Sequence, residues 1–213
     1  MAESWGEPAL GLRERKKRRT RATLIDAAVG LCDRQGYDAT TVDQIAHVAE
    51  VSPRTFSRYF ATKDAIALAL IDEVLVHTAV ELVRQPRYLP HMEALRRAYV
   101  AMTEASKLAP PGALSAQRLL QILRIIVSSP TLRQAAVGYR AGPVDAVVAE
   151  RMGATVDDRR VKLVAAVWGV VLMTALQDVC RSAVDFGVDD VIAAVEATYA
   201  EFAGEIAGVV QPV

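Results

Sequence analysis

The chain has 213 residues, of which 52% are hydrophobic and 23% are charged. This length allows one medium domain or a small domain fused to a larger one, and the hydrophobic content excludes a disordered chain. The formal net charge is zero, but residues 11–63 hold eleven Lys and Arg against six Asp and Glu. A basic segment on a mildly acidic remainder indicates nucleic-acid binding, because Lys and Arg displace counterions from phosphates. The alternative is a solvated basic arm.

The chain lacks the patterns of exported, membrane and metal-binding proteins. Cys32 and Cys180 lie far apart and suit neither a disulfide framework nor a metal site. The longest apolar run, 163–173, is shorter than the roughly 20 residues that cross a bilayer. We therefore expect a soluble cytoplasmic protein without a membrane partner, a metal or a cofactor.

Almost the whole chain shows the three-to-four spacing of apolar residues that is typical of helices. We predict an all-α fold of about nine helices, with an N-terminal three-helix DNA-binding domain of the helix-turn-helix type. A larger helical domain follows. The predicted boundaries are a basic flexible arm at 1–19, the DNA-binding domain at 20–66 and the larger domain at 67–213.

The arm leads into the first helix through a run of basic residues. Arg18, Arg19 and Arg21 are candidates for the minor groove or for phosphates. The alternative is an exposed, mobile tail without defined contacts. Within the first helix, Cys32 shares a face with four apolar residues, which predicts a core position rather than a redox sensor: Leu24, Ala27, Ala28 and Leu31.

The next stretch carries explicit signals for helix starts. Thr41 followed by Gln44 forms a capping box and predicts a helix over 42–48. Ser52 and Pro53 are an N-cap and a first-turn proline, which start a second helix after a short turn. Thr62 caps a third. This arrangement predicts a helix-turn-helix.

The second of these helices is the candidate for reading DNA. Phe56 and Phe60 are four residues apart and are expected to anchor it in the core. An outward face with Arg and Ser near a helix N-terminus suits the major groove, whereas Tyr59 and Lys63 are better placed for phosphates. The residues expected on that outward face are Pro53, Arg54, Ser57 and Arg58.

The run T-T-V-x-x-I-A-x-x-A-x-V-S-x-x-T-F-x-x-Y-F-x-x-K-x-x-I resembles the DNA-binding signature of the TetR (tetracycline repressor) family over roughly residues 20–70. The chain departs from this signature at Glu50, where the family usually has Gly, so the turn must accept a side chain. It also has Ser57 in place of a frequent aromatic residue. The resemblance implies a homodimer on a double-stranded DNA operator, with contacts from the basic arm and from Thr41, Ser52, Arg54, Thr55, Arg58, Tyr59 and Lys63.

The C-terminal half is expected to supply the dimer interface. The segment 163–176 is apolar on every side except at Thr174, which predicts a helix that is buried all round. The family resemblance implies that helices near 157–182 and 189–209 pair with their copies across a two-fold axis. The predicted contact stripe, which could instead be an ordinary core stripe, is Val191, Ala194, Val195, Thr198, Phe202 and Ile206.

A ligand cavity is expected between helices that start near Met92, Leu114 and Asp157. Pockets for small molecules are mostly apolar with a few polar groups, although a plain core has the same composition. The expected effector is a small apolar or acyl-like molecule. Its candidate walls are Leu95, Tyr99, Met102, Leu119, Leu123, Ile126, Trp168 and Leu172, and its candidate polar anchors are Gln121, Arg124, Thr174 and Gln177.

These patterns favour a ligand-responsive DNA-binding regulator, most commonly a repressor, over two alternatives. A helical enzyme would need a nucleophile, a metal site or a cofactor motif, and the sequence offers none of them. A scaffold that docks a protein on its helix-turn-helix is disfavoured by the basic charge and by the outward Arg54 and Arg58. In the regulator, ligand would favour a spacing of the recognition helices that no longer matches successive major grooves.

Overall fold

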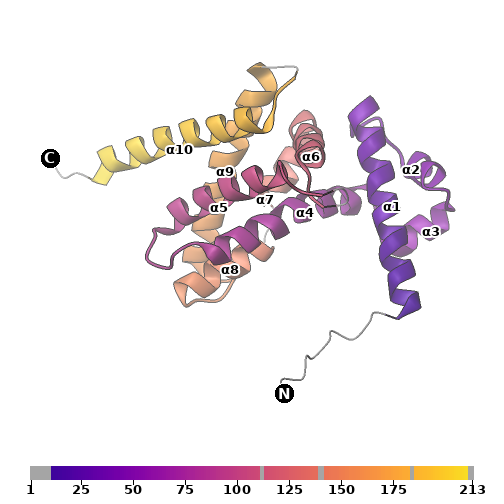
Figure 1. The fold of residues 1–213 in the computed structure, drawn as a ribbon, viewed down its shortest axis with the longest axis horizontal. Coiled ribbons are helices and arrows are strands. Elements are labelled where there is room, and N and C mark those ends of the chain that lie inside the picture. Colours follow the sequence, from indigo (N-terminus) through magenta and orange to yellow (C-terminus); the bar gives the residue numbers. More distant parts are fainter. Residues whose placement is uncertain (1–10, 111–112, 139–141, 183–184, 211–213) are drawn as a thin grey trace.

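The computed structural model describes residues 11–110, 113–138, 142–182 and 185–210. Over these residues the fold is all-α, as predicted, with ten helices rather than about nine (Figure 1). The helices are α1 (Leu12–Gln35), α2 (Val42–Val48), α3 (Pro53–Tyr59), α4 (Lys63–Arg84), α5 (His91–Ser106), α6 (Ala116–Ser128), α7 (Pro130–Gly138), α8 (Pro143–Met152), α9 (Arg159–Ser182) and α10 (Val188–Val210).

The three predicted capping residues all start helices. The Thr41 side chain accepts a hydrogen bond from the Gln44 backbone amide (3.2 Å), and the Gln44 side chain accepts one from the Thr41 amide (2.9 Å). Ser52 accepts from the Thr55 amide at 3.1 Å, and Thr62 caps α4 in the same way. These bonds satisfy amides that would otherwise lack partners at the helix ends, so local sequence alone fixes where the helices begin.

Helices α1 to α3 form a lobe at one end of the molecule, and α4 runs from this lobe into the body (Figure 1). The first helix is longer than predicted, because residues 12–19 of the expected flexible arm are helical and belong to α1. Residues 1–10 of that arm lie outside the described residues. Glu50, in the turn between α2 and α3, has a φ of 55°, the left-handed conformation that glycine adopts most easily.

The remaining helices build the body around one apolar core. Helix α4 packs against α5 and α8, and α9 packs against α10, α8 and α7. Helix α6 touches α1 as well as α7 and α9, so it joins the N-terminal lobe to the body. The core continues from the lobe into the body through the buried side chains of Ile66 and Leu70 on α4.

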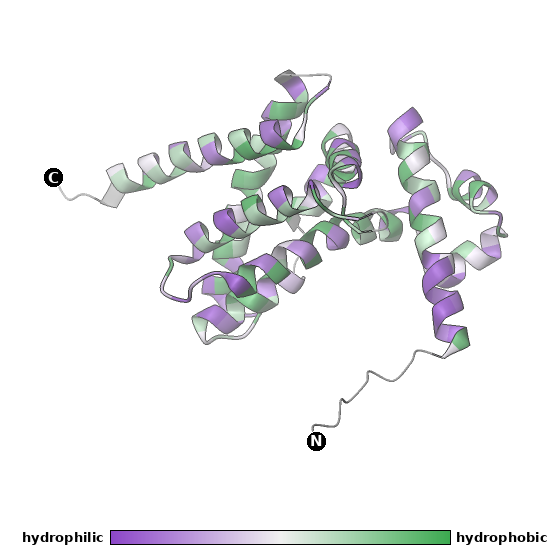
Figure 2. Cartoon of the chain, viewed as in Figure 1, coloured by the Kyte–Doolittle hydropathy of each residue, from purple (hydrophilic) through white to green (hydrophobic). Residues whose placement is uncertain are grey.

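Helix α9 is not buried all round, contrary to the sequence prediction. Leu163 and Val170 remain 60% and 54% exposed, although Trp168 and Leu176 are buried. Hydrophobic residues dominate this helix in Figure 2. By length and composition, the segment Arg159–Arg181 could cross a membrane, and 39% of its most apolar window is buried within the chain. One face of α9 therefore packs in the body while another is uncovered in the single chain.

Candidate DNA-binding surface and ligand cavity

Helix α3 is anchored from behind and presents polar side chains outward. Phe56 and Phe60 are buried, with ring centroids 5.8 Å apart, as the sequence predicted. Four candidate residues on the opposite side are exposed: Pro53, Arg54, Ser57 and Arg58. Thr41 and Ser52 are also exposed and Thr55 is half-buried, with its hydroxyl 3.0 Å from that of Ser52. The candidate residues at the start of α2 and on the outer side of α3 are therefore at least partly accessible to solvent.

The basic N-terminal turns of α1 lie beside this surface, and Figure 2 shows them as the hydrophilic end of the helix. The side chains of Arg18, Arg19 and Arg21 are exposed, and the Arg21 guanidinium lies 5.1 Å from the centre of the Phe60 ring. Residues of α1 and α3 line a shared surface hollow, including Lys17, Thr20, Arg58 and Tyr59. A hydrogen bond from Thr20, followed by the effect of Arg58, lowers the pKa of Tyr59.

Lys63 is engaged within the chain. Its ammonium group donates to the backbone carbonyl of Tyr37 at 3.0 Å and lies 4.2 Å from the centre of the Tyr37 ring. The Tyr37 hydroxyl donates to Asp64, and burial together with this bond raises its pKa. Sequence reasoning missed Tyr37, which ties the end of α1 to the start of α4.

A cavity of about 100 Å³ lies within the body, walled mainly by apolar residues. Five of the eight predicted wall residues line it: Tyr99, Leu123, Ile126, Trp168 and Leu172. The other three, Leu95, Met102 and Leu119, are buried but lie outside its lining. Helices α4 and α8 also contribute, through Ile71, Val74, Leu75, Val144 and Asp145, which sequence reasoning missed.

None of the four predicted polar anchors lines the cavity. Gln121 donates to Asp33 of α1 at 3.3 Å, and the Arg124 guanidinium lies 5.5 Å from the Phe186 ring centre. Thr174 is exposed and donates to the Val170 carbonyl, and Gln177 is half-buried away from the lining. The lining residues whose side chains carry a polar atom are instead Tyr99, Asp145 and Trp168.

The predicted dimerisation stripe divides into two parts. Val191 and Val195 are buried within the chain itself, whereas Ile206 is 48% exposed. Ala194, Thr198 and Phe202 have intermediate exposure. The division arises because α10 starts against the body and then extends beyond it towards the C-terminus (Figure 1). Only the second half of the stripe is available to another molecule.

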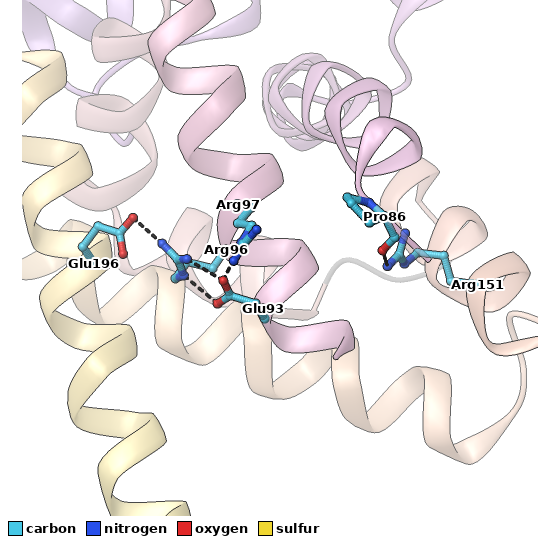
Figure 3. Close-up of polar contacts among 6 residues, drawn as sticks. All are labelled: Pro86, Glu93, Arg96, Arg97, Arg151 and Glu196. Carbon is cyan, nitrogen blue, oxygen red and sulfur yellow. Dashed lines mark hydrogen bonds and ion pairs between the residues drawn. The ribbon is translucent and has the colours of Figure 1, made fainter. Parts of the chain in front are cut away.

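An ionic cluster fixes α10 to α5 (Figure 3). Arg96 binds Glu93 through two nitrogen atoms, at 2.8 and 2.6 Å, and also pairs with Glu196 of α10. Its guanidinium lies 5.5 Å from the Tyr199 ring centre. Hydrogen bonds from Arg96 lower the pKa of Glu93 to about 2. At another corner of the body, Arg151 of α8 donates to the carbonyls of Gln85 (2.9 Å) and Pro86 (2.8 Å) at the end of α4.

Comparisons with known proteins agree with the position of the helix-turn-helix. Residues 24–70 match the profile of "Bacterial regulatory proteins, tetR family". Over 64 residues the chain is 55% identical to the HTH-type transcriptional regulator TcmR of Streptomyces glaucescens. This aligned region makes up 30% of this chain and 28% of TcmR. Over 91 residues it is 37% identical to the HTH-type transcriptional regulator HbdR of Aromatoleum sp. (strain CIB), and this aligned region makes up 41% of this chain and 40% of HbdR. The chain thus spans less than half the length of either relative.

Solved structures share the overall fold at low sequence identity. A TetR-family regulator from Streptomyces coelicolor superposes with a TM-score of 0.53 at 19% identity, over 89% of this chain and 98% of that one. SmeT, the repressor of a multidrug efflux pump of Stenotrophomonas maltophilia, superposes with a TM-score of 0.51 at 19% identity, over 85% of this chain and 89% of SmeT. Both sequence relatives are HTH-type transcriptional regulators. Residues 24–70 therefore match the DNA-binding domain of the tetR family of bacterial regulatory proteins, and the described residues share the fold of a TetR-family regulator.

Proposed function

We propose that the chain is a ligand-responsive repressor that binds a palindromic operator as a homodimer and releases it when a small molecule occupies the cavity. The observation that carries this proposal is the position of α6. Its residues Leu123 and Ile126 line the cavity. On the side towards the lobe, Arg118 of the same helix contacts Asp26 of α1 at 3.1 Å. Any shift of α6 on ligand binding therefore acts directly on the DNA-binding lobe.

Two further contacts support this path between the cavity and the lobe. Gln121 of α6 bonds Asp33 near the end of α1, and Ser129 at the end of α6 bonds Asp38 at 3.4 Å. Helix α4 provides a parallel connection, because Ile71 lines the cavity one turn after the residues that pack in the lobe. Ligand shifts the population of lobe orientations only if it binds one orientation more tightly than the other.

DNA binding is supported by the charge and shape of the lobe. The exposed arginines of α3 suit base edges and phosphates, and the basic turns of α1 extend the contact along the backbone. Because α1 is helical from Leu12 onward, the described part of the predicted arm would meet phosphates as a rigid helical end. The proposed contacts are Arg18, Arg19, Arg21, Thr41, Ser52, Pro53, Arg54, Thr55, Ser57, Arg58 and Tyr59, with Lys63 holding the start of α4 in place.

Dimerisation is supported by the uncovered apolar residues of α9 and α10. Leu163, Val170 and Thr174 lie within one face of α9, since residues seven and eleven apart return to the same side of a helix. The projecting half of α10 adds Ile206. A second copy that packs the same two helices against these would bury both surfaces at once, as a two-fold interface requires. In this proposal the protein works in the cytoplasm, where the operator DNA is accessible.

The test is selection of bound sequences from randomised duplex DNA by the purified protein. We expect a palindromic motif that is lost when Arg54 and Arg58 are both changed to Ala. Arg84→Ala removes an exposed arginine from the far end of α4 and serves as the matched control. If no motif is enriched at moderate salt, the helix-turn-helix does not read bases, and the scaffold interpretation replaces this one.

A further inference from the structure

The end of α4 that lies farthest from the lobe is held by an arginine of another helix. Helix α4 ends at Arg84, because Pro86 disfavours a helical conformation at Gln85, and its last carbonyl groups lack helical partners. Arg151, in the last turn of α8, donates to the carbonyl of Gln85 at 2.9 Å and to that of Pro86 at 2.8 Å (Figure 3). These two bonds fix the end of α4 against α8.

The surroundings of Arg151 are not arranged for stability alone. Its Nε atom is buried and has no hydrogen-bond partner among the described residues, which costs free energy. Its neighbour Glu150 pairs with Arg87 instead, and burial, followed by repulsion from Arg87, lowers the pKa of Arg151. A guanidinium group that is kept at this cost points to a role in orientation, because its planar fork holds two acceptors in one geometry.

Helix α4 is held by directional contacts at two points along its length. Near its middle, Glu73 faces the guanidinium of Arg118 from α6, with two nitrogen–oxygen distances of 3.3 Å. The bonds from Arg151 lie about 18 Å further along the helix, at 1.5 Å per residue. The apolar contacts of α4 with α5 and α8 are non-directional. Because two points define an axis, the contacts of Arg118 and Arg151 set the direction of α4.

The start of α4 carries the DNA-binding lobe. Lys63 and Asp64 are both bonded to Tyr37 at the end of α1, so the lobe follows the direction of α4. The start of α4 lies about 15 Å from Glu73, so a tilt about Glu73 displaces the two ends of the helix by similar distances. Successive base pairs of DNA are about 3.4 Å apart. A movement of a few ångströms at the end held by Arg151 is therefore comparable to one base pair at the lobe.

We infer that Arg151 is a positioning residue that sets the spacing of the two recognition helices on DNA. Arg151 belongs to α8, which packs against α9 as well as α4. Helix α9 carries the uncovered apolar face that we assign to the two-fold interface. Arg151 thereby fixes α4 relative to the dimer axis from the end opposite the lobe. The inference rests on the proposed dimer and operator, and it goes beyond them by assigning the spacing of the half-sites to one side chain.

The test measures binding of the full chain to the selected palindrome and to two duplexes with one base pair inserted or removed between the half-sites. One base pair changes their separation by about 3.4 Å and their relative rotation by about 35°. The ratio of the dissociation constants for the altered and the original duplex is the spacing penalty.

Arg151→Met keeps the apolar stem of the side chain and removes its donors. We expect this variant to bind the original palindrome about threefold more weakly, because a smaller fraction of molecules holds the matching spacing. Its spacing penalty should be smaller than that of the wild type by a factor of about three or more, since other spacings become populated. A mere loss of folded protein would weaken binding to all three duplexes by the same factor and leave the penalty unchanged.

Arg87→Met is the matched control. It removes an arginine at the same corner whose pair with Glu150 is exposed, and it should keep the wild-type penalty. Circular dichroism checks that each variant is folded. If Arg151→Met does not fold, Arg151→Lys replaces it under the same criteria, because a single ammonium group lacks the planar fork. An unchanged penalty in the folded Arg151 variant, or an equal reduction in Arg87→Met, overturns the inference.

The inference and the proposed function fail in different ways. A wild-type protein that selects no palindrome contradicts the proposed function, and the inference falls with it. If the wild type selects a palindrome of fixed spacing and the Arg151 variant has the same spacing penalty, only the inference is wrong. The proposed dimer on its operator then remains supported.

Discussion

Replacing Arg118 with Gln should weaken the join between the body and the DNA-binding lobe. Arg118 is 17% exposed and reaches two helices: its guanidinium contacts Asp26 of α1 at 3.1 Å and faces Glu73 of α4 with two nitrogen–oxygen distances of 3.3 Å. Asp26 is largely exposed and contributes little, whereas the forked contact with the half-buried Glu73 contributes more. We expect a loss of about 1–2 kcal/mol in the free energy of unfolding.

The measurement is thermal unfolding of Arg118→Gln, Glu73→Gln and the double variant. A loss of this size lowers the midpoint by about 2–8 °C in a protein of this length. Because the two side chains share one contact, the double variant should lose clearly less than the sum of the single losses, by about 1 kcal/mol. Arg97→Gln removes an exposed arginine of α5 that pairs with Glu93 and should lower stability less. Additive losses at Arg118 and Glu73 would refute the bridging role.

Three further predictions concern the turn, the ionic cluster and the uncovered helix. Glu50→Gly should raise the free energy of unfolding by about 0.5–1 kcal/mol, measured by urea denaturation, because Gly adopts a φ of 55° without strain; Glu50→Ala should not. The pKa of Glu93 falls from 4.5 to about 2 on folding, so it stabilises the protein above pH 4.5, and this contribution is lost as the pH falls towards 2. The stability difference between the wild type and Glu93→Gln should therefore disappear over that interval, and a constant difference would contradict the assignment. Val170→Glu should give a folded monomer in sedimentation velocity, whereas Lys162→Glu, at an exposed polar site near the start of α9, should not.

The DNA-binding lobe could be predicted in detail because its signals are local. A capping box or an N-cap with a following proline fixes a helix start within four residues of chain, and Thr41, Ser52 and Thr62 all act as expected. Glu50 also followed from its place in the signature, since a two-helix turn that usually has Gly imposes a positive φ. The helical state of residues 12–19 was missed, because a dense run of Arg and Lys looks the same in an arm and in a helix.

The cavity was predicted less well, because its lining depends on how helices rotate against one another. Leu95 and Leu123 have the same local pattern, yet only Leu123 faces the cavity. The polar anchors were chosen for lying on the expected helices, but Gln121 belongs to the face of α6 that meets α1. Asp145 carried no signal beyond an acidic residue in the first turn of a helix, a common position for a favourable charge.

Helix α9 shows why an apolar sequence does not identify what covers it. Its composition alone is compatible with a core helix, a membrane span or an interface. The structure separates the faces: Trp168 and Leu176 pack inward, while Leu163 and Val170 lie two turns apart on an outer face that also carries Thr174. A bilayer would surround the whole helix, whereas here five other helices contact it. The second copy that we propose would cover this one side, and burial of apolar area at roughly 25 cal/mol per Å² would favour such a pairing.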